Sequence, residues 1–221
     1  FMAFNPGDEV LFTRWDSLEN FGPNRVESAE LLEPRVMLLT MEEPLPENIN
    51  EKDAIENITW TPEAEISGNK VILVPTRGFL ITTRRKVVVE DNSFYRTRMS
   101  AILVENDAKG WFESGPVRDL TIRKNRFFYC REPVIHMNPR NELPNPAVHR
   151  NIRILYNDFA LQNKIAVKAK STKGLLVKGN KIYAEDPPSD NEAIITDDSV
   201  DIQIKSNRYR PLDGWKHEFA D

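Results

Sequence analysis

From about residue 66 onward, one pattern of apolar and polar positions recurs along the chain. Each copy has an aliphatic residue, two polar residues, an asparagine, any residue and a large apolar residue, as in Ile-Arg-Lys-Asn-Arg-Phe at 122–127. The six asparagines are Asn69, Asn92, Asn125, Asn157, Asn180 and Asn207, separated by 23, 33, 32, 23 and 27 residues. A repeat in this range is typical of solenoids, in which successive copies stack on one another.

The repeat predicts β-strands, because each copy is a short β-branched run, a polar turn and a further apolar residue. A second apolar run follows every corner but the last, at Gly78–Thr82, Ala101–Val104, Pro133–His136, Ile165–Val167 and Ala193–Thr196. No helical pattern separates the two sets of strands, which excludes a βαβ fold. We therefore predict an all-β protein built around a right-handed parallel β-helix.

Asparagine has a physical reason to recur at the corner of each coil. A sharp corner strains most side chains, whereas Asn tolerates left-handed backbone geometry and bonds neighbouring backbone groups. We expect the stacked amides to bond one another in a ladder. We also expect apolar pairs such as Val89 with Phe94, and Ile122 with Phe127, to fill the interior of the coils.

The first 62 residues lack the repeat. Segments 7–12, 25–32 and 35–40 show partial alternation and are separated by turn signals, which predicts a small antiparallel β-barrel or sandwich. Charge supports a boundary, because residues 1–65 hold 15 acidic and 4 basic residues, and the remainder holds 19 and 26. We predict three regions: a β-barrel at 1–62, the β-helix at 63–212 and a C-terminal tail at 213–221. Because nothing before Glu63 fits the repeat, we expect a piece of a longer protein that lacks earlier coils.

Composition argues against several other classes of protein. The single cysteine, Cys130, cannot form an internal disulfide, so we expect a buried and inert thiol. Basic residues are spread along the coils, which argues against binding of nucleic acid. No apolar run reaches 18 residues, so we predict no membrane span. No group of residues has metal-ligand spacing, and we expect neither metal nor other cofactor.

The insertion between the second and third corners carries the most chemistry. Residues 105–116, Glu-Asn-Asp-Ala-Lys-Gly-Trp-Phe-Glu-Ser-Gly-Pro, follow a predicted strand directly and combine three carboxylates, an indole and two glycines. This combination suits a sugar, because an aromatic face stacks on a pyranose and carboxylates supply an acid, a base and hydroxyl acceptors. The alternative is a surface loop whose Trp111 covers the end of a coil.

These segments resemble the core of a known family. The matching residues are Thr-Thr-Arg-Arg-Lys-Val-Val-Val-Glu-Asp-Asn-Ser-Phe at 82–94, Ala-Ile-Leu-Val at 101–104, Asp-Ala at 107–108 and Trp-Phe-Glu-Ser-Gly-Pro-Val-Arg-Asp at 111–119. They are similar to the parallel β-helix α-1,3-galactosidases, bacterial glycoside hydrolases that remove terminal galactose from the blood group B determinant and related glycans. That family also places a small β-barrel ahead of this segment, ending in a stretch similar to Glu56–Pro62.

The resemblance implies a secreted or periplasmic enzyme that hydrolyses galactose-terminated glycans without a metal and with inversion of the anomeric centre. Inversion requires a carboxylic acid that protonates the leaving oxygen and a carboxylate that activates water, with the two carboxyls about 6.5–9.5 Å apart. The first candidates for this pair are Asp107 and Glu113, which lie six residues apart across the loop. Glu105 and Asp91 are alternative candidates for one member of this pair. The residues expected to bind the sugar are Arg84, Arg85, Glu105, Trp111 and His136.

Each proposed sugar ligand has a structural alternative. Arg84 and Arg85 end a coil strand, where a fork of donors suits galactose hydroxyls or orients a carboxylate. Alternatively, they are surface charges that offset Glu90 and Asp91. His136 lies on the same strand of the next coil, where it either bonds a substrate hydroxyl or is a satisfied histidine of the wall.

Two other functions compete with hydrolysis. A non-catalytic glycan-binding or structural β-helix keeps the asparagine ladder and Trp111 without a paired acid and base. A polysaccharide lyase needs a basic catalytic residue, often together with calcium held by acidic groups, and the sequence has no compact cluster of Asp for calcium. The oligomeric state does not follow from the sequence.

Overall fold

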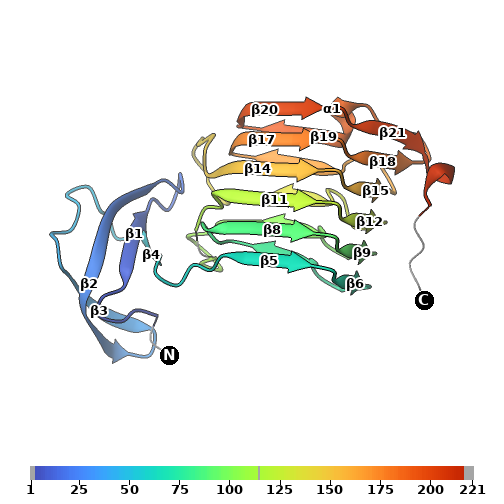
Figure 1. The fold of residues 1–221 in the computed structure, drawn as a ribbon. Helices are drawn as coiled ribbons and strands as arrows, with labels where there is room; N and C mark the ends of the chain where they lie inside the picture. Colours follow the sequence, from blue (N-terminus) through green and yellow to red (C-terminus); the bar gives the residue numbers. More distant parts are fainter. Residues whose placement is uncertain (1–2, 114, 217–221) are drawn as a thin grey trace.

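The computed structural model describes residues 3–113 and 115–216, and these form two β units (Figure 1). Residues 217–221 of the predicted C-terminal tail therefore lie outside the described part. The N-terminal unit is one antiparallel sheet with the strand order β3-β2-β1-β4. Its strands are β1 (Glu9–Thr13), β2 (Asn20–Glu33), β3 (Val36–Met41) and β4 (Ala54–Asn57). Because β3 and β4 do not pair in the described residues, the predicted small barrel is an open half-barrel.

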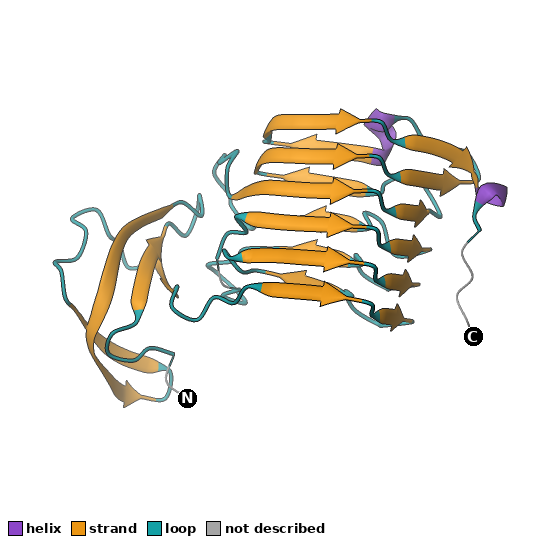
Figure 2. Cartoon of the chain, viewed as in Figure 1, coloured by secondary structure: helices purple, strands orange, loops and turns teal. Residues whose placement is uncertain are grey.

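The second unit is the predicted parallel β-helix, and each full coil gives one strand to each of three parallel sheets (Figure 2). The first sheet contains β5 (Ala64–Ser67), β8 (Lys86–Glu90), β11 (Asp119–Arg123), β14 (His149–Leu155), β17 (Thr172–Lys178) and β20 (Val200–Lys205). The second contains β6 (Lys70–Ile72), β9 (Ser93–Tyr95), β12 (Arg126–Phe128), β15 (Asp158–Ala160), β18 (Lys181–Ala184) and β21 (Arg208–Pro211). The third contains β7 (Phe79–Ile81), β10 (Ile102–Val104), β13 (Ile135–Met137), β16 (Val167–Lys170) and β19 (Ile194–Asp197). Helix α1 (Asp190–Ala193) and a 3-10 turn (Leu212–Gly214) complete the described elements.

The interior of the coils is a column of stacked apolar side chains. The predicted core residues Val89, Phe94, Ile122, Phe127, Ile154 and Phe159 have no exposed surface. Ring centroids of Phe94 and Phe127 are 4.9 Å apart, those of Phe127 and Phe159 are 4.8 Å apart, and both pairs are nearly parallel. The apolar residues that recur in the sequence thus form a continuous stack, and this stack excludes water from the interior.

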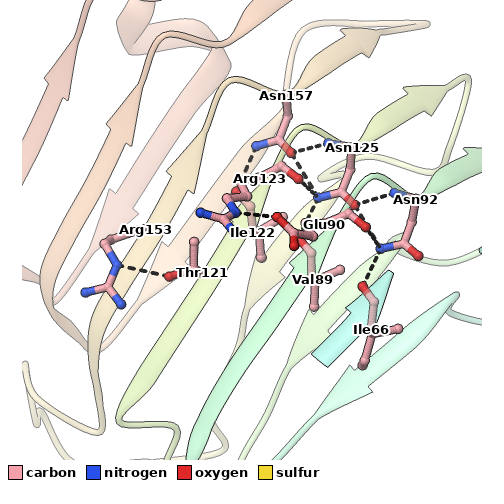
Figure 3. A network of polar contacts seen from close by, with 10 residues as sticks. All are labelled: Ile66, Val89, Glu90, Asn92, Thr121, Ile122, Arg123, Asn125, Arg153 and Asn157. Atoms are coloured by element: carbon pink, nitrogen blue, oxygen red, sulfur yellow. Dashed lines mark hydrogen bonds and ion pairs between the residues drawn. The ribbon is translucent and has the colours of Figure 1, made fainter. Parts of the chain in front are cut away.

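The asparagines form the predicted ladder, part of which is drawn in Figure 3. From Asn69 to Asn207, each side-chain amide donates to the Oδ1 of the next asparagine at 2.9–3.0 Å. The expected backbone geometry was wrong by one residue, because positive φ belongs to the residue before each asparagine: Gly68, Asp91, Lys124, Tyr156, Gly179 and Ser206. That residue turns the chain, so the asparagine keeps an ordinary backbone conformation with its amide aimed at the stacked carbonyls.

The half-barrel docks on the loops that run from the third sheet to the first sheet (Figure 1). The carbonyl of Asp16 accepts the backbone N–H of Glu142 at 2.6 Å, and Asn145 donates to the carbonyl of Ser17 at 2.9 Å. These contacts connect residues more than 120 positions apart. The insertion at 105–116 also lies beside the half-barrel, where its Ala108 packs with Leu18.

Candidate active site

The insertion 105–116 leaves the third sheet after β10, returns to the first sheet at β11 and is held between the two units. Its Ala108 packs in a small apolar cluster with Leu18 of the half-barrel. Gly115 approaches Glu56 of β4 so closely that an added Cβ would lie 2.1 Å from the Glu56 Oε1. Gly115 also has a φ of +63°, which favours glycine. The loop is therefore a docked segment of the junction.

Asp107 organises the first half of this loop. Its Oδ1 accepts the backbone N–H groups of Lys109 at 2.8 Å and Gly110 at 3.1 Å, and its Oδ2 accepts that of Trp111 at 2.9 Å. Burial raises the pKa of this carboxyl, but the three backbone donors and the charge of Arg140 outweigh burial and lower it overall. Asp107 is therefore an ionised carboxylate with one acceptor position left on Oδ2.

Glu113, at the other end of the loop, has the opposite electrostatic character. Burial raises its pKa, and the facing carboxyl of Glu105 raises it further, while Arg77 opposes the rise from 3.4 Å. Its buried Oε2 has no donor among the described residues. Glu105 is only 3% exposed and pairs with Arg140. A facing carboxyl and burial both disfavour the charged form of Glu113, so this geometry favours its protonated form.

His136 lies on the outer face of the third sheet, next to this carboxylate pair. The register aligns it with Leu103 of β10 and Lys168 of β16, while its sequence neighbours Ile135 and Met137 fill the core. Burial, and then the charge of Lys168, lower its pKa to about 4. His136 is therefore a neutral imidazole at pH 7 that can donate and accept hydrogen bonds.

Two hollows adjoin the loop. One, of about 310 Å³, lies between the units and is lined in part by Glu56, Asn106, Asp107 and Glu113. The other, of about 410 Å³, lies on the outer side of Asp107. Trp111 lines this outer hollow and is 82% exposed, so its indole face is open to a ligand. Asp107 borders both hollows, and the loop is the wall between them.

The remaining predicted site residues divide into those near the site and those away from it. Arg84 donates from Nε to the Glu56 Oε1 at 3.1 Å and also pairs through Nη2, so it joins the β-helix to the half-barrel beside the inner hollow. Arg85 is exposed and lines neither hollow. Asp91 has a φ of +54° at a corner between the first and second sheets, away from this edge.

Two residues of the cluster were missed in the sequence, namely Arg77 and Arg140. Each comes from a loop on a neighbouring coil and binds one member of the Glu105–Glu113 pair. The repeat gives a signal for Arg140, because Glu105 and Arg140 follow the third-sheet strands β10 and β13 of successive coils, whereas Arg77 precedes β7 and has no such signal. In the described residues, no group of three His, Cys, Asp or Glu side chains is placed to hold a metal ion. Within the same part of the chain, no helix is long and apolar enough to cross a membrane.

Fold and site together define a parallel β-helix protein with an antiparallel half-barrel and a carboxylate-rich cluster at their junction. Residues 1–55 match the family described as GLAA-B beta-barrel domain II. Alpha-1,3-galactosidase A of Bacteroides thetaiotaomicron is 44% identical over 214 residues, which are 94% of this chain and 38% of that protein. The chain is thus homologous to proteins named α-1,3-galactosidase, which confirms the resemblance seen in the sequence.

Two other relatives are also named α-1,3-galactosidase, and the chain covers a similar share of each. Alpha-1,3-galactosidase A of Akkermansia muciniphila is 40% identical over 203 residues, covering 92% of this chain and 33% of that protein. Alpha-1,3-galactosidase B of Bacteroides fragilis is 37% identical over 202 residues, covering 80% of this chain and 34% of that protein. The chain therefore spans little more than a third of the length of these curated relatives.

Proposed function

We propose that this chain carries the catalytic loop of a glycoside hydrolase that removes terminal α-1,3-linked galactose with inversion of the anomeric centre. One observation carries the proposal: Asp107 and Glu113, at the two ends of one loop, line the same hollow between the units, and their surroundings displace their pKa values in opposite directions. Two carboxyls whose environments push their pKa values apart are suited to act as an acid and a base. The printed names of the relatives support galactose in α-1,3 linkage as the substrate.

In this mechanism Glu113 is the general acid. Burial and Glu105 raise its pKa and so favour the protonated form, which gives its proton to the glycosidic oxygen as the bond to the anomeric carbon breaks. Asp107 is the general base, and its free acceptor position on Oδ2 takes a proton from the attacking water. Water adds from the face opposite the leaving group, so α-linked galactose is released as the β anomer.

The neighbouring residues bind the sugar and orient the carboxyls. Arg140 holds Glu105 in place, and Arg77 contacts Glu113 from the preceding coil. Trp111 offers its exposed face to the apolar side of the pyranose. Neutral His136 supplies a hydrogen bond to a sugar hydroxyl from the outer face of the third sheet.

The roles are tested by comparing the parent protein with Glu113→Gln, Asp107→Asn and the exposed control Glu185→Gln. On an α-1,3-galactobioside we expect both site variants to lose at least a hundredfold in kcat/KM, because general acid–base catalysis contributes about 10²–10⁴. Proton NMR should show β-galactose as the first product of the parent protein.

A change of leaving group separates the two roles. A dinitrophenyl galactoside needs no protonation, so Glu113→Gln should recover most of its activity on it, whereas Asp107→Asn should not. Equal losses on both substrates for both variants would reject this assignment. Tight galactoside binding by the parent protein with no cleavage would instead support a glycan-binding module.

A further inference from the structure

A separate hollow of about 340 Å³ lies where the turn before β2 meets the segment 144–147 ahead of β14. Its lining includes the side chains of Arg118, Arg150 and Asn20. None of these residues takes part in the carboxylate cluster. The half-barrel forms one wall of this hollow and the β-helix forms the other.

The two arginines are close together. Arg118 donates from Nη1 to the carbonyl oxygen of Ala147 at 3.5 Å, and Arg150 donates from Nε to the same oxygen at 3.2 Å. Because both bonds share one acceptor, the two nitrogens are at most about 7 Å apart, where like charges repel appreciably. Burial, and then the charge of Arg150, lower the pKa of Arg118 to about 10.

Neither arginine has a carboxylate partner among the ion pairs of the described residues. The acids that neighbour Arg118 in sequence or in space are engaged elsewhere, since Asp119 pairs with Arg153 and Glu56 pairs with Arg84. Glu19 also lines the hollow, but it is exposed and forms no ion pair with either guanidinium. Two adjacent positive charges therefore face a cavity, and neither forms an ion pair within the described residues.

The guanidinium groups also have unused donors. Each guanidinium has five N–H groups. Among the described residues, Arg118 uses two of them, on Ala147 and on Asn20 Oδ1 at 3.3 Å, and Arg150 uses one. The free N–H groups are planar forks, the geometry that matches the oxygens of a carboxylate or a sulfate.

We propose that this hollow binds an oxyanion, a sulfate ester or a carboxylate, carried by the glycan on which the protein acts. Arg118 and Arg150 donate to its oxygens from the β-helix side, and the bound anion offsets the repulsion between them. The oxyanion site rests on the geometry of the two arginines alone. That a sugar carries the anion rests on the function proposed above.

The site itself is tested with sodium sulfate at constant ionic strength, followed by NMR of the arginine side-chain Nε–H signals. We expect saturable shifts in the parent protein and binding at least tenfold weaker in Arg150→Gln, whose side chain is exposed and leaves the contact of Arg118 with Asn20 in place. Arg208→Gln, an exposed arginine on β21, should bind sulfate within twofold of the parent. No saturable binding, or equal binding by Arg150→Gln and the parent, would overturn the proposal.

The carrier of the anion is tested with galactose 6-sulfate, galacturonate and galactose on the same variants. We expect the parent to bind at least one anionic sugar more tightly than galactose, and Arg150→Gln to lose that preference. Equal binding of all three sugars, with sulfate binding still dependent on Arg150, would mean that the site takes a free anion. That result would remove the glycan from the proposal without bearing on catalysis by the 105–116 loop.

Discussion

Replacing Asn125 by alanine tests the asparagine ladder at a fully buried point. Its Nδ2 donates to the carbonyls of Val89 and Arg123 and to the Oδ1 of Asn157, at 2.9–3.0 Å. Its Oδ1 accepts the backbone N–H and the Nδ2 of Asn92, both at 3.0 Å. All five bonds are lost in Asn125→Ala, and the buried backbone N–H of Asn92 is left without its acceptor (Figure 3).

The magnitude follows from these bonds. A typical intramolecular hydrogen bond contributes about 1 kcal/mol net, and an orphaned buried donor costs about 1–3 kcal/mol. Because neighbouring groups rearrange and recover part of the lost hydrogen bonding, we expect the free energy of unfolding to fall by about 3–5 kcal/mol. Asn69→Ala is the matched control, since the exposed Asn69 side chain makes two such bonds and water can replace it. Its loss should be below about 1 kcal/mol.

Urea unfolding followed by far-UV circular dichroism measures both losses, and an unchanged slope against urea would show that the unfolding reaction itself is the same. The reasoning requires Asn125→Ala to unfold at clearly lower urea than Asn69→Ala. Similar midpoints for the two variants would refute it. The ladder would then stabilise the corners no more than an exposed amide does.

Three further changes test the site. Glu105→Gln removes a charge that raises the pKa of Glu113, so the alkaline limb of kcat/KM should move to lower pH; an unmoved limb in the pH–rate profile would exclude the pairing. Trp111→Ala removes an exposed indole, so the melting temperature should stay the same while KM for galactosides rises severalfold; an unchanged KM in steady-state kinetics would exclude sugar stacking. Gly115→Ala presses a Cβ against Glu56 at a φ of +63°, and should lower the free energy of unfolding by about 1–3 kcal/mol. Wild-type stability in urea would show that the loop is not tightly docked.

The sequence predicted most of the β-helix because its determinants are local and periodic. Ile122 and Phe127 fall at fixed distances from Asn125, and the same spacing on every coil makes a stack whatever the length of the intervening loop. The sequence did not show that Lys124, rather than Asn125, takes the left-handed turn. Asn is the residue type expected in a left-handed turn, but the Asn125 amide is held by the carbonyls of Val89 and Arg123, and the preceding residue takes the turn instead.

The site was less predictable, because its contacts cross coils and cross the junction. Composition marked the 105–116 loop, which contains Asp107 and Glu113. It did not reveal that Glu105 faces Glu113, that Arg140 holds Glu105, or that Arg84 pairs with Glu56 of the half-barrel. These partners lie 28 or more residues apart in two of the three pairs, and only the docking of the two units brings the last pair together.

The most direct test of the proposed mechanism is proton NMR of an α-1,3-galactobioside during hydrolysis, with Glu113→Gln run in parallel. The mechanism predicts that β-galactose appears first and mutarotates later, and that Glu113→Gln is at least a hundredfold slower. First release of α-galactose would contradict inversion. Unchanged turnover by Glu113→Gln would contradict the role of Glu113 as the acid.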